Sequence, residues 1–312
     1  MELVNKSKKK KSLLRKKDNL LFDIMALPGV LLMIIFSYIP MFGLVIAFQD
    51  YKYNKGIFGS EWIGFKNFEF FFTSSDAGRI LKNTLTLNLT FILLSVFVAV
   101  VFALLLFEIN SRRTLKTYQT VLLLPYFLSW VVVGCMAYAF LSPSMGIING
   151  FLGNLGMEGI DWYAKPKYWP FILAFFHIWK NVGYNSIIYY AGLMGIDNSL
   201  FEAAELDGAN KLQKILHISI PEITPLICTM TLLSLGGIFR SDFGLFYQLT
   251  RDIGILYPTT DVIDTYIFRA LKTNADVGMS AAVGFFQSVV GFVTIITANA
   301  IVKKIEKDNA IF

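Results

Sequence analysis

The chain has 312 residues, of which 55% are hydrophobic, 15% aromatic and only 16% charged, and its mean hydropathy is +0.57. This composition is too apolar for an ordinary water-soluble domain of this length, so it indicates a chain that lies in lipid. The net charge of +6 does not indicate nucleic-acid binding, because eight of the basic residues lie within the first 17 positions, where a cluster beside a membrane segment is typical of a cytoplasmic anchor attracted to anionic lipid.

Apolar runs predict six transmembrane helices. A helix needs about 20 mostly apolar residues to cross a bilayer, and such runs recur at 22–48, 80–107, 118–141, 168–195, 223–248 and 279–302. The first run could also be a cleaved signal peptide, but it is too long and lacks a small-residue cleavage site, so we expect a retained span. The predicted fold is an all-α integral membrane protein.

The basic residues predict the orientation of these spans. Six crossings place both termini on one side, and the segments on that side carry sixteen Lys and Arg residues. The opposite segments, 49–82, 142–167 and 249–278, carry ten. Since Lys and Arg accumulate in short cytoplasmic segments, we expect both termini in the cytoplasm. Aromatic residues in the outward segments are more often interface anchors than ligand contacts.

The connection 197–221, between the predicted fourth and fifth spans, has its own local signals. Ser199 followed by Glu202 is a capping-box pattern, which predicts a helix that begins at Leu200. Gly208 can adopt the left-handed conformation that ends such a helix. We therefore expect a short helix with a sharp corner at its end.

A second helix is expected to follow that corner. Asn210 can cap it, and the pattern continues to about Leu216. Pro221 is then expected to stop the helix before the fifth span. The connection would form a bent helix pair in the cytoplasm.

The same connection carries a long motif. It reads Glu202-Ala203-Ala204, then Asp207-Gly208-Ala209 after two further residues, and finally Ile218-x-Ile220-Pro221. This pattern resembles the EAA motif of binding-protein-dependent ABC transporter permeases. The resemblance implies a type I ABC importer permease fold, in which the pair is the coupling helix that docks in a groove of a separate ATPase.

The ATPase-coupling residues implied by this resemblance are Glu202, Ala203, Ala204, Asp207, Gly208 and Ala209. Paired alanines also allow another backbone to come close. The alternative is that Glu202 only caps its own helix and Gly208 only ends it. The two interpretations are compatible, because a coupling lever must first be folded.

Resemblance extends over most of the chain. Tyr38–Tyr51, Trp62–Phe68, Trp179–Gly183, Asp261–Tyr266 and Ala282–Val289 resemble the carbohydrate-uptake branch of these permeases, specifically its LplB-like polysaccharide group. That branch imports sugars or oligosaccharides, although some members take other solutes, so the identity and length of the substrate stay open.

The resemblance also implies a domain organisation, a location and partners. We expect a basic cytoplasmic segment over 1–21, a six-span permease domain over 22–302 that contains the EAA segment 197–221, and a cytoplasmic tail over 303–312. The expected location is the plasma membrane of a bacterium, of the Gram-positive type. Expected partners are a second, different permease, two copies of a cytoplasmic ABC ATPase, and an extracellular binding protein, commonly a lipoprotein in Gram-positive cells.

Polar side chains inside the predicted spans are candidates for a substrate pathway, because such groups are costly in lipid unless they have a partner or line a passage. The candidates are Asn181, Tyr184, Asn185, Arg240 and Asp242. They combine hydrogen-bonding groups with an aromatic ring, which suits a sugar. The alternative is that they join neighbouring helices by hydrogen bonds and ion pairs.

The sequence contains no motif for chemistry of its own. It has no Gly-x-x-x-x-Gly-Lys-Ser/Thr loop, so ATP and Mg²⁺ are expected to bind to the partner ATPase, and no cofactor or enzymatic activity is expected in this chain. His177 and His217 lack partners at metal-ligand spacing, so we predict no metal site. Cys135 and Cys228 lie in apolar runs and are expected to be packing residues.

Two functions from other classes compete with the importer. An ion-coupled secondary transporter would use Asp242 or Lys180 as its ion-coupled group, but it leaves the segment 197–221 without a purpose. A membrane enzyme that acts on lipid-linked sugar would need paired acids or a metal cluster at the membrane face, and the sequence shows no convincing pair.

Overall fold

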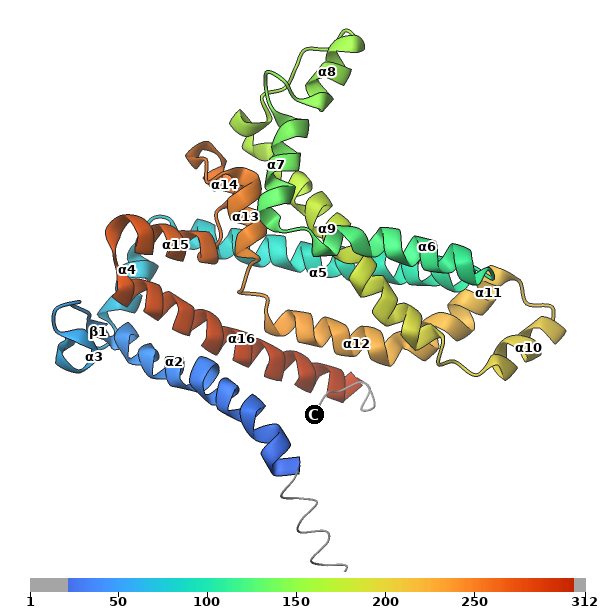
Figure 1. The fold of residues 1–312 in the computed structure, drawn as a ribbon, viewed down its shortest axis with the longest axis horizontal. Helices are drawn as coiled ribbons and strands as arrows, with labels where there is room; N and C mark the ends of the chain where they lie inside the picture. Colours follow the sequence, from blue (N-terminus) through green and yellow to red (C-terminus); the bar gives the residue numbers. More distant parts are fainter. Residues whose placement is uncertain (1–21, 306–312) are drawn as a thin grey trace, which may run out of the picture.

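The computed structural model describes residues 22–305, and its long helices lie roughly side by side while a group of shorter helices projects from them (Figure 1). The longest elements are the helix Phe22–Phe48, which contains η1 (Ile34–Tyr38), α2 (Ile39–Met41) and η2 (Phe42–Phe48), together with α5 (Ala77–Phe107), α9 (Trp169–Leu193), α12 (Ile220–Gly236) and α16 (Val277–Ile305). The helix α6 (Arg112–Leu123) is shorter, with 12 residues.

Shorter elements connect the long helices. Near the first long helix lie an antiparallel pair of two-residue strands, β1 (Gln49–Asp50) and β2 (Glu61–Trp62), and the helices α3 (Gly56–Gly59) and α4 (Lys66–Thr73). The strands pair Gln49 with Trp62 and Asp50 with Glu61. The remaining short elements are η3 (Leu124–Phe127), α7 (Trp130–Leu141), α8 (Ile147–Asn154), η4 (Trp162–Ala164), η5 (Pro166–Tyr168), α10 (Asn198–Leu206), α11 (Lys211–Lys214), η6 (Ile215–Ser219), α13 (Phe243–Thr250), η7 (Gly254–Leu256), α14 (Tyr257–Thr260) and α15 (Ile263–Asn274).

Four helices in the described part of the chain are long and apolar enough to cross a membrane: Phe22–Phe48, Ala77–Phe107, Lys211–Gly236 and Val277–Lys304. A bent pair, Arg112–Phe127 with Trp130–Leu141, would be a fifth span if its halves act together. A helix also forms at the predicted fourth span, Trp169–Leu193, but it is not among these apolar helices. The six-span count therefore stays a prediction. The basic segment 1–21 and most of the tail 303–312 lie outside the described residues.

The predicted fifth span, 223–248, is wrong in its bounds. The helix begins earlier, at Lys211, and ends at Gly236, where Gly236-Gly237 closes it with hydrogen bonds typical of a turn. The chain then runs through a short connection before α13 begins. Because glycine is the poorest helix former after proline, two adjacent glycines favour a break at this point.

The prediction that Pro221 stops the second cytoplasmic helix is also wrong. The π-helical turn η6 lies just before Pro221, and Ile220 donates its backbone N–H to the carbonyl of Ile215, one residue farther back than in an α-helix. This wider turn accommodates a residue without an N–H donor, so the helix continues through the proline. One helical path thus runs from the connection 197–221 into the bundle.

The predicted third span, 118–141, is broken in the structure. Its two halves meet at an angle of 96°. Pro125 is the second residue of the short turn η3, and Ser129 caps α7 by accepting a hydrogen bond from the backbone N–H of Val132 at 3.4 Å. Such irregular backbone is tolerated at membrane depth only where protein or a water-filled space surrounds it.

The largest buried cluster lies where α5, α7, α9 and α13 meet. It contains Phe91, Trp169, Leu173, Leu245 and Phe246, each at most 3% exposed. By contrast, only 6% of the apolar window of the first helix, Phe22–Phe48, is buried inside the chain. A membrane protein exposes apolar side chains to lipid, so packing in its interior depends on close helix contacts more than on hydrophobicity.

The closest helix contact at a glycine is at Gly183. A Cβ atom at this position of α9 would overlap the backbone carbonyl of Leu122 near the end of α6. We expect Gly183→Ala to force α9 away from the broken span and to lower the free energy of unfolding by about 1–3 kcal/mol. The thermal unfolding of the detergent-solubilised protein measures this loss.

Gly284→Ala is the matched control, because Gly284 also lies in a long helix but has open space where its Cβ would be. Alanine favours a helix over glycine, so the control is expected to be neutral or slightly stabilising. Equal stability of the two variants would contradict the close contact at Gly183.

Candidate functional site

The connection 197–221 begins with a capped helix, but its cap differs from the predicted one. The helix α10 begins at Asn198, two residues before the predicted start, and Asp197 caps it by accepting the backbone N–H of Ser199 at 2.9 Å. That hydrogen bond holds the pKa of the Asp197 carboxyl below its usual range. A carboxylate in this place also interacts favourably with the helix dipole. Glu202 is therefore not the partner of a Ser199 cap, and its side chain is exposed.

The corner after α10 forms as predicted at Gly208, whose φ angle is +81°. Ala209 donates its backbone N–H to the carbonyl of Ala204, and Gly208 donates to that of Glu205, at 2.9 and 3.0 Å. This pair of bonds is the Schellman motif, which satisfies the last carbonyls of a helix and fixes the direction of the chain. The corner is therefore a defined turn.

The second cap also forms as predicted. Asn210 accepts the backbone N–H of Gln213 at 3.0 Å, and the Gln213 side chain accepts the N–H of Asn210 at 2.8 Å. This reciprocal capping box begins α11. Since α11 continues through η6 into α12, the corner is joined directly to a long helix of the bundle.

Three contacts fix this connection to itself and to α5. Lys214 pairs with Glu205 at 2.7 Å, and Lys211 pairs with Glu108 just after the end of α5, also at 2.7 Å. Phe201 of α10 packs against Phe107 with ring centroids 5.8 Å apart. The hydrogen bond and charge of Lys214 lower the pKa of Glu205. A displacement of α10 would therefore be transmitted to the ends of α5 and α12.

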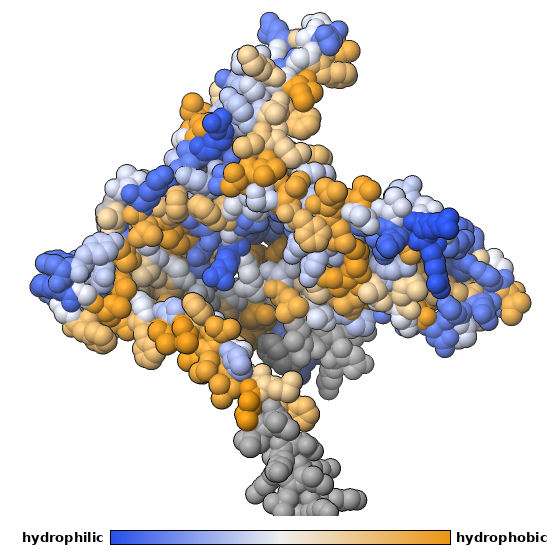
Figure 2. Space-filling view, in the orientation of Figure 1, coloured by the Kyte–Doolittle hydropathy of each residue, from blue (hydrophilic) through white to orange (hydrophobic). Residues whose placement is uncertain are grey.

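The outward surface of this connection has no neighbour in the described structure. Glu202, Ala203, Asp207 and Gly208 are exposed, and Leu206 between them is 90% exposed. The same end of the molecule carries a dense group of hydrophilic residues (Figure 2). An exposed leucine within a rigid, polar corner is a suitable contact for another protein.

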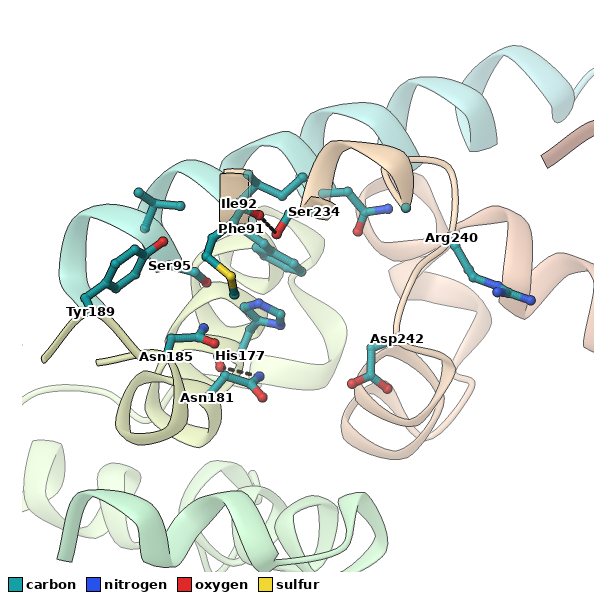
Figure 3. Close-up of a pocket in the computed structure, with 14 residues that line it drawn as sticks. Phe91, Ile92, Ser95, His177, Asn181, Asn185, Tyr189, Ser234, Arg240 and Asp242 are labelled. Carbon is teal, nitrogen blue, oxygen red and sulfur yellow. Dashed lines mark hydrogen bonds between the residues drawn. The ribbon is translucent and has the colours of Figure 1, made fainter. Parts of the chain in front are cut away.

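A second candidate site is a central pocket of about 320 Å³ between α5, α9 and the connection that follows α12 (Figure 3). Its lining includes the rings of Phe91 and His177, which stack with their centroids 4.7 Å apart. Hydrophilic residues also gather near the middle of the face seen in Figure 2, within a frame of hydrophobic surface. The polar lining consists of Asn88, Ser95, His177, Asn181, Asn185, Tyr189, Ser234, Arg240 and Asp242.

Four of the five pathway candidates from the sequence meet in this pocket: Asn181, Asn185, Arg240 and Asp242. The fifth, Tyr184, is not among its lining residues, because its ring stacks on Tyr126 with centroids 4.7 Å apart. Arg240 and Asp242 were expected inside a span, but they lie in the non-helical connection between α12 and α13. They therefore lie between the C-terminal end of α12 and the N-terminal end of α13.

Sequence reasoning missed Ser95, Tyr189 and Ser234 as lining residues. Ser95 lies seven residues after Asn88, a spacing that puts both on one face of α5, and this signal could have identified it. Nothing local distinguishes Tyr189 or Ser234 from other residues of their helices.

The connection that carries Arg240 and Asp242 is held by three other helices. Asn88 of α5 donates to the carbonyl of Ile238 at 2.7 Å and to Ser241 Oγ at 3.0 Å. Asp264 of α15 accepts the backbone N–H of Ser241 at 2.7 Å. Gln287 of α16 donates to the carbonyl of Phe239 at 2.7 Å. These bonds satisfy backbone groups that a broken helix leaves open.

Asp242 joins the pocket to the broken span. Its carboxylate caps α13 by accepting the N–H groups of Gly244 and Leu245, and it also accepts the indole N–H of Trp130 at 2.7 Å. Trp130 is the first residue of α7. A Cβ atom at Gly244 would overlap the Trp130 ring, so this contact requires glycine.

Lys180 holds the break itself. Its side chain is buried, and Nζ donates to the carbonyls of Tyr126 and Leu128 at 2.7 and 2.6 Å and to that of Pro125 at 3.4 Å. The same ammonium lies 5.3 Å from the centroid of the Trp130 ring. A cation is the natural partner of carbonyls that point out of the end of a helix. The ammonium group of Lys180 is therefore occupied by hydrogen bonds to backbone carbonyls.

Family membership follows from comparison with known proteins. Residues 71–307 match the family described as binding-protein-dependent transport system inner membrane component. The chain belongs to this family. The permease is also 33% identical over 302 residues to the polygalacturonan/rhamnogalacturonan transport system permease protein YteP of Bacillus subtilis (strain 168), which covers 97% of this chain and 94% of that protein.

Two further relatives agree. Protein LplB of Bacillus subtilis (strain 168) is 33% identical over 94% of the permease and 91% of its own length. A solved structure of a bacterial alginate ABC transporter, in complex with an alginate pentasaccharide-bound periplasmic protein, contains a chain with a TM-score of 0.83 and 35% identity, over 94% of the permease and 96% of that chain. The type I importer fold expected from the sequence is thus shared with a transporter of known structure.

Lys180→Met tests how the broken span is held. The variant keeps a long apolar side chain but leaves the carbonyls at the break without their donor. An unsatisfied buried acceptor costs about 1–3 kcal/mol, so we expect the free energy of unfolding to fall by about 3 kcal/mol. Thermal unfolding of the purified permease measures the change.

Lys167→Met provides the control, because Lys167 lies in η5, just before α9, 4.8 Å from the centroid of the Tyr168 ring and outside the break. Its replacement is expected to change stability by less than about 0.5 kcal/mol. A similar loss in both variants would show that the carbonyls of the break do not depend on Lys180.

Proposed function

We propose that this permease is the membrane-spanning subunit of an ABC importer that carries a sugar or oligosaccharide through the central pocket and is driven by a separate ATPase. The observation that carries the proposal is the continuous helical path Lys211–Gly236. One end leaves the rigid corner at Gly208, and the other contributes Ser234 and Gly237 to the pocket. Movement at the corner is thus coupled mechanically to the place where a solute would lie.

The exposed corner supports a docking role for Glu202, Ala203, Ala204, Asp207, Gly208 and Ala209. In this proposal, closure of two ATPase copies moves α10, and the contacts of α10 with α5 and α11 transmit the motion to the bundle. The pocket then changes from outward-facing to inward-facing access. ATP and Mg²⁺ bind to the ATPase, both termini lie in the cytoplasm, and the membrane is that of a Gram-positive bacterium.

The pocket supports a carbohydrate cargo. Amide, hydroxyl and charged groups line it beside the rings of Phe91 and Tyr189, which is the combination that sugar binding uses. Within the described chain, Ser95 Oγ and His177 Nδ1 are buried without a hydrogen-bond partner. A polyhydroxylated solute could supply the missing partners. The relatives that carry polygalacturonan, rhamnogalacturonan or alginate in their names agree with this cargo class.

A second permease and an extracellular binding protein complete the proposed assembly. In this proposal a different permease supplies the remainder of the pathway beside the pocket. The binding protein would deliver the solute at the outer face, as the periplasmic protein bound to the alginate transporter suggests by analogy.

An ion-coupled secondary transporter is less well supported. Its ion-coupled group would be Asp242 or Lys180, but the Asp242 carboxylate accepts three hydrogen bonds and Lys180 is bound to three carbonyls. Neither side chain is free to bind and release an ion without opening the fold. The cytoplasmic corner would also have no purpose.

The docking role is tested by Glu202→Ala and Gly208→Val. Valine is strained at the φ angle of Gly208, so it should distort the corner, whereas the alanine variant removes an exposed side chain only. We expect both variants to insert normally but to lose ATP-dependent uptake and solute-stimulated ATP hydrolysis by roughly tenfold or more. Both activities are measured in proteoliposomes that contain the complete transporter.

Gly208→Asn is the control, because asparagine tolerates the left-handed conformation and open space surrounds the missing Cβ. It is expected to keep most of the activity. Normal uptake in both Glu202→Ala and Gly208→Val would refute the docking role.

Asn185→Ala tests the pathway. No hydrogen bond from the Asn185 side chain is seen in the described structure, so the variant should leave assembly unchanged while uptake falls about tenfold through the loss of one or two solute contacts. The initial rate of uptake and the yield of assembled complex are the two measurements. Tyr184→Phe, outside the pocket, should alter neither. Loss of assembly in step with uptake would instead favour a role in joining helices.

A further inference from the structure

A second cavity, of about 380 Å³, lies between α7 and α13, apart from the central pocket. It is lined by Val131, Gly134, Cys135, Tyr138, Tyr247, Gln248 and Arg251. The two helices come close at Gly134, where a Cβ atom would lie only 2.9 Å from the carbonyl oxygen of Gln248. The side chains of Tyr138, Tyr247 and Arg251 contribute to the lining beside this contact.

The polar groups of this cavity have unused hydrogen-bonding capacity. Among residues 22–305, the Arg251 guanidinium forms no ion pair, and no side-chain hydrogen bond is seen for Gln248, Tyr138 or Tyr247. The guanidinium lies over the Tyr138 ring, 4.3 Å from its centroid. In that stacked position its N–H donors lie in the plane of the group and can bind a carboxylate with two parallel hydrogen bonds.

The charge of the cavity is positive. Its lining contains Arg251 and no acidic residue, whereas the central pocket contains Asp242 as well as Arg240. The nearest acid in the chain, Asp252, is directed elsewhere: it pairs with Arg269 at 3.1 Å and accepts the Tyr257 hydroxyl at 3.0 Å. An anion that reaches this cavity therefore meets a cation whose charge no described side chain neutralises.

The backbone beneath the guanidinium is strained. Arg251 and Asp252 both have positive φ angles, 56° and 53°, which residues with a Cβ rarely adopt. Such conformations cost free energy and recur at functional sites. Here the conformation turns the Arg251 side chain back over Tyr138 while Asp252 faces Arg269, which separates the cation from the adjacent acid.

The helix α13 connects the two cavities. Asp242 at its first end lines the central pocket, and Arg251 at its last end lines the second cavity. Its eight residues span about 12 Å. A chain of several sugar rings could lie along this helix and contact both cavities.

We propose that the cavity between α7 and α13 is a second carbohydrate subsite, selective for a sugar residue that carries a carboxylate, with Arg251 as its anion-binding residue. This subsite rests on the proposed import of carbohydrate. It adds a substrate class to that function, namely oligosaccharides that contain uronic acids, and it places the acid-reading residue outside the central pocket.

The complete transporter in proteoliposomes tests the subsite, with its own partner subunits and binding protein. The probes are trigalacturonate and its carboxyl-reduced, neutral counterpart. We expect Arg251→Gln to raise the half-saturating concentration of trigalacturonate about tenfold, the effect of losing a charge-assisted hydrogen-bonded contact. The value for the neutral trisaccharide should change less than twofold. Because wild type and variant use the same binding protein, its own preference cancels in their ratio.

Two variants make the result specific. Arg251→Lys keeps the charge and is expected to recover part of the trigalacturonate uptake. Lys167→Gln removes another cation that lies over a tyrosine ring, in η5, and it should leave uptake of both sugars unchanged.

Each other outcome identifies what fails. If the wild-type transporter imports neither trisaccharide, the subsite is refuted, and the proposed function falls only if no sugar or oligosaccharide delivered by the binding protein is imported. If import is normal but Arg251→Gln slows both sugars equally, or Arg251→Lys recovers nothing, the subsite is refuted while the proposed function stands. If Arg251→Gln reduces the yield of the assembled transporter, the guanidinium pairs with a carboxylate of a partner subunit, and the subsite is likewise refuted.

Discussion

Inside a bilayer every backbone polar group needs a partner, and the permease meets this requirement at its broken third span through one buried ammonium. Lys180 of α9 donates to the carbonyls of Pro125 and Tyr126, at the end of the first half, and of Leu128 in the break, where the chain bends by 96°. Without these bonds, the free carbonyls would favour a continuous helix or a displaced α7. With them, α7 leaves the direction of α6 and crosses toward α13. The architecture around the central pocket depends on this arrangement.

The bend also explains how the pocket obtains its charged residues. Trp130 begins α7, and its indole donates to Asp242, which caps α13. Asp242 can occupy that place only because α12 has already ended at Gly236. The break between α12 and α13 therefore supplies Arg240 and Asp242 to the pocket, where a continuous span would present an apolar face, and the bend before α7 places Trp130 against Asp242. Broken helices at a solute site are a common solution in membrane transporters.

The proposed mechanical coupling rests on a helix that continues past Pro221, where the sequence predicts its end. The π-turn η6 carries the helix past Pro221, so the Schellman corner at Gly208 and the pocket residue Ser234 belong to one continuous path. The pair of Lys211 with Glu108 adds a second attachment, to α5. A rigid corner that is attached to two helices can transmit a displacement to both of them, because little of the displacement is absorbed by local bending.

Local signals determined much of this protein. Apolar runs located the helices because lipid solvates apolar side chains wherever they occur, and Gly208 and Asn210 fixed the corner because helix caps depend on neighbours within a few residues. The tertiary structure decided what depends on distant partners. The carbonyls bound by Lys180 lie more than fifty positions away in the chain. For the same reason the sequence did not predict that α12 ends before Arg240, or that Asp197 rather than Ser199 caps α10. Where several residues could cap or end a helix, the contacts that each one forms in the folded molecule decide between them.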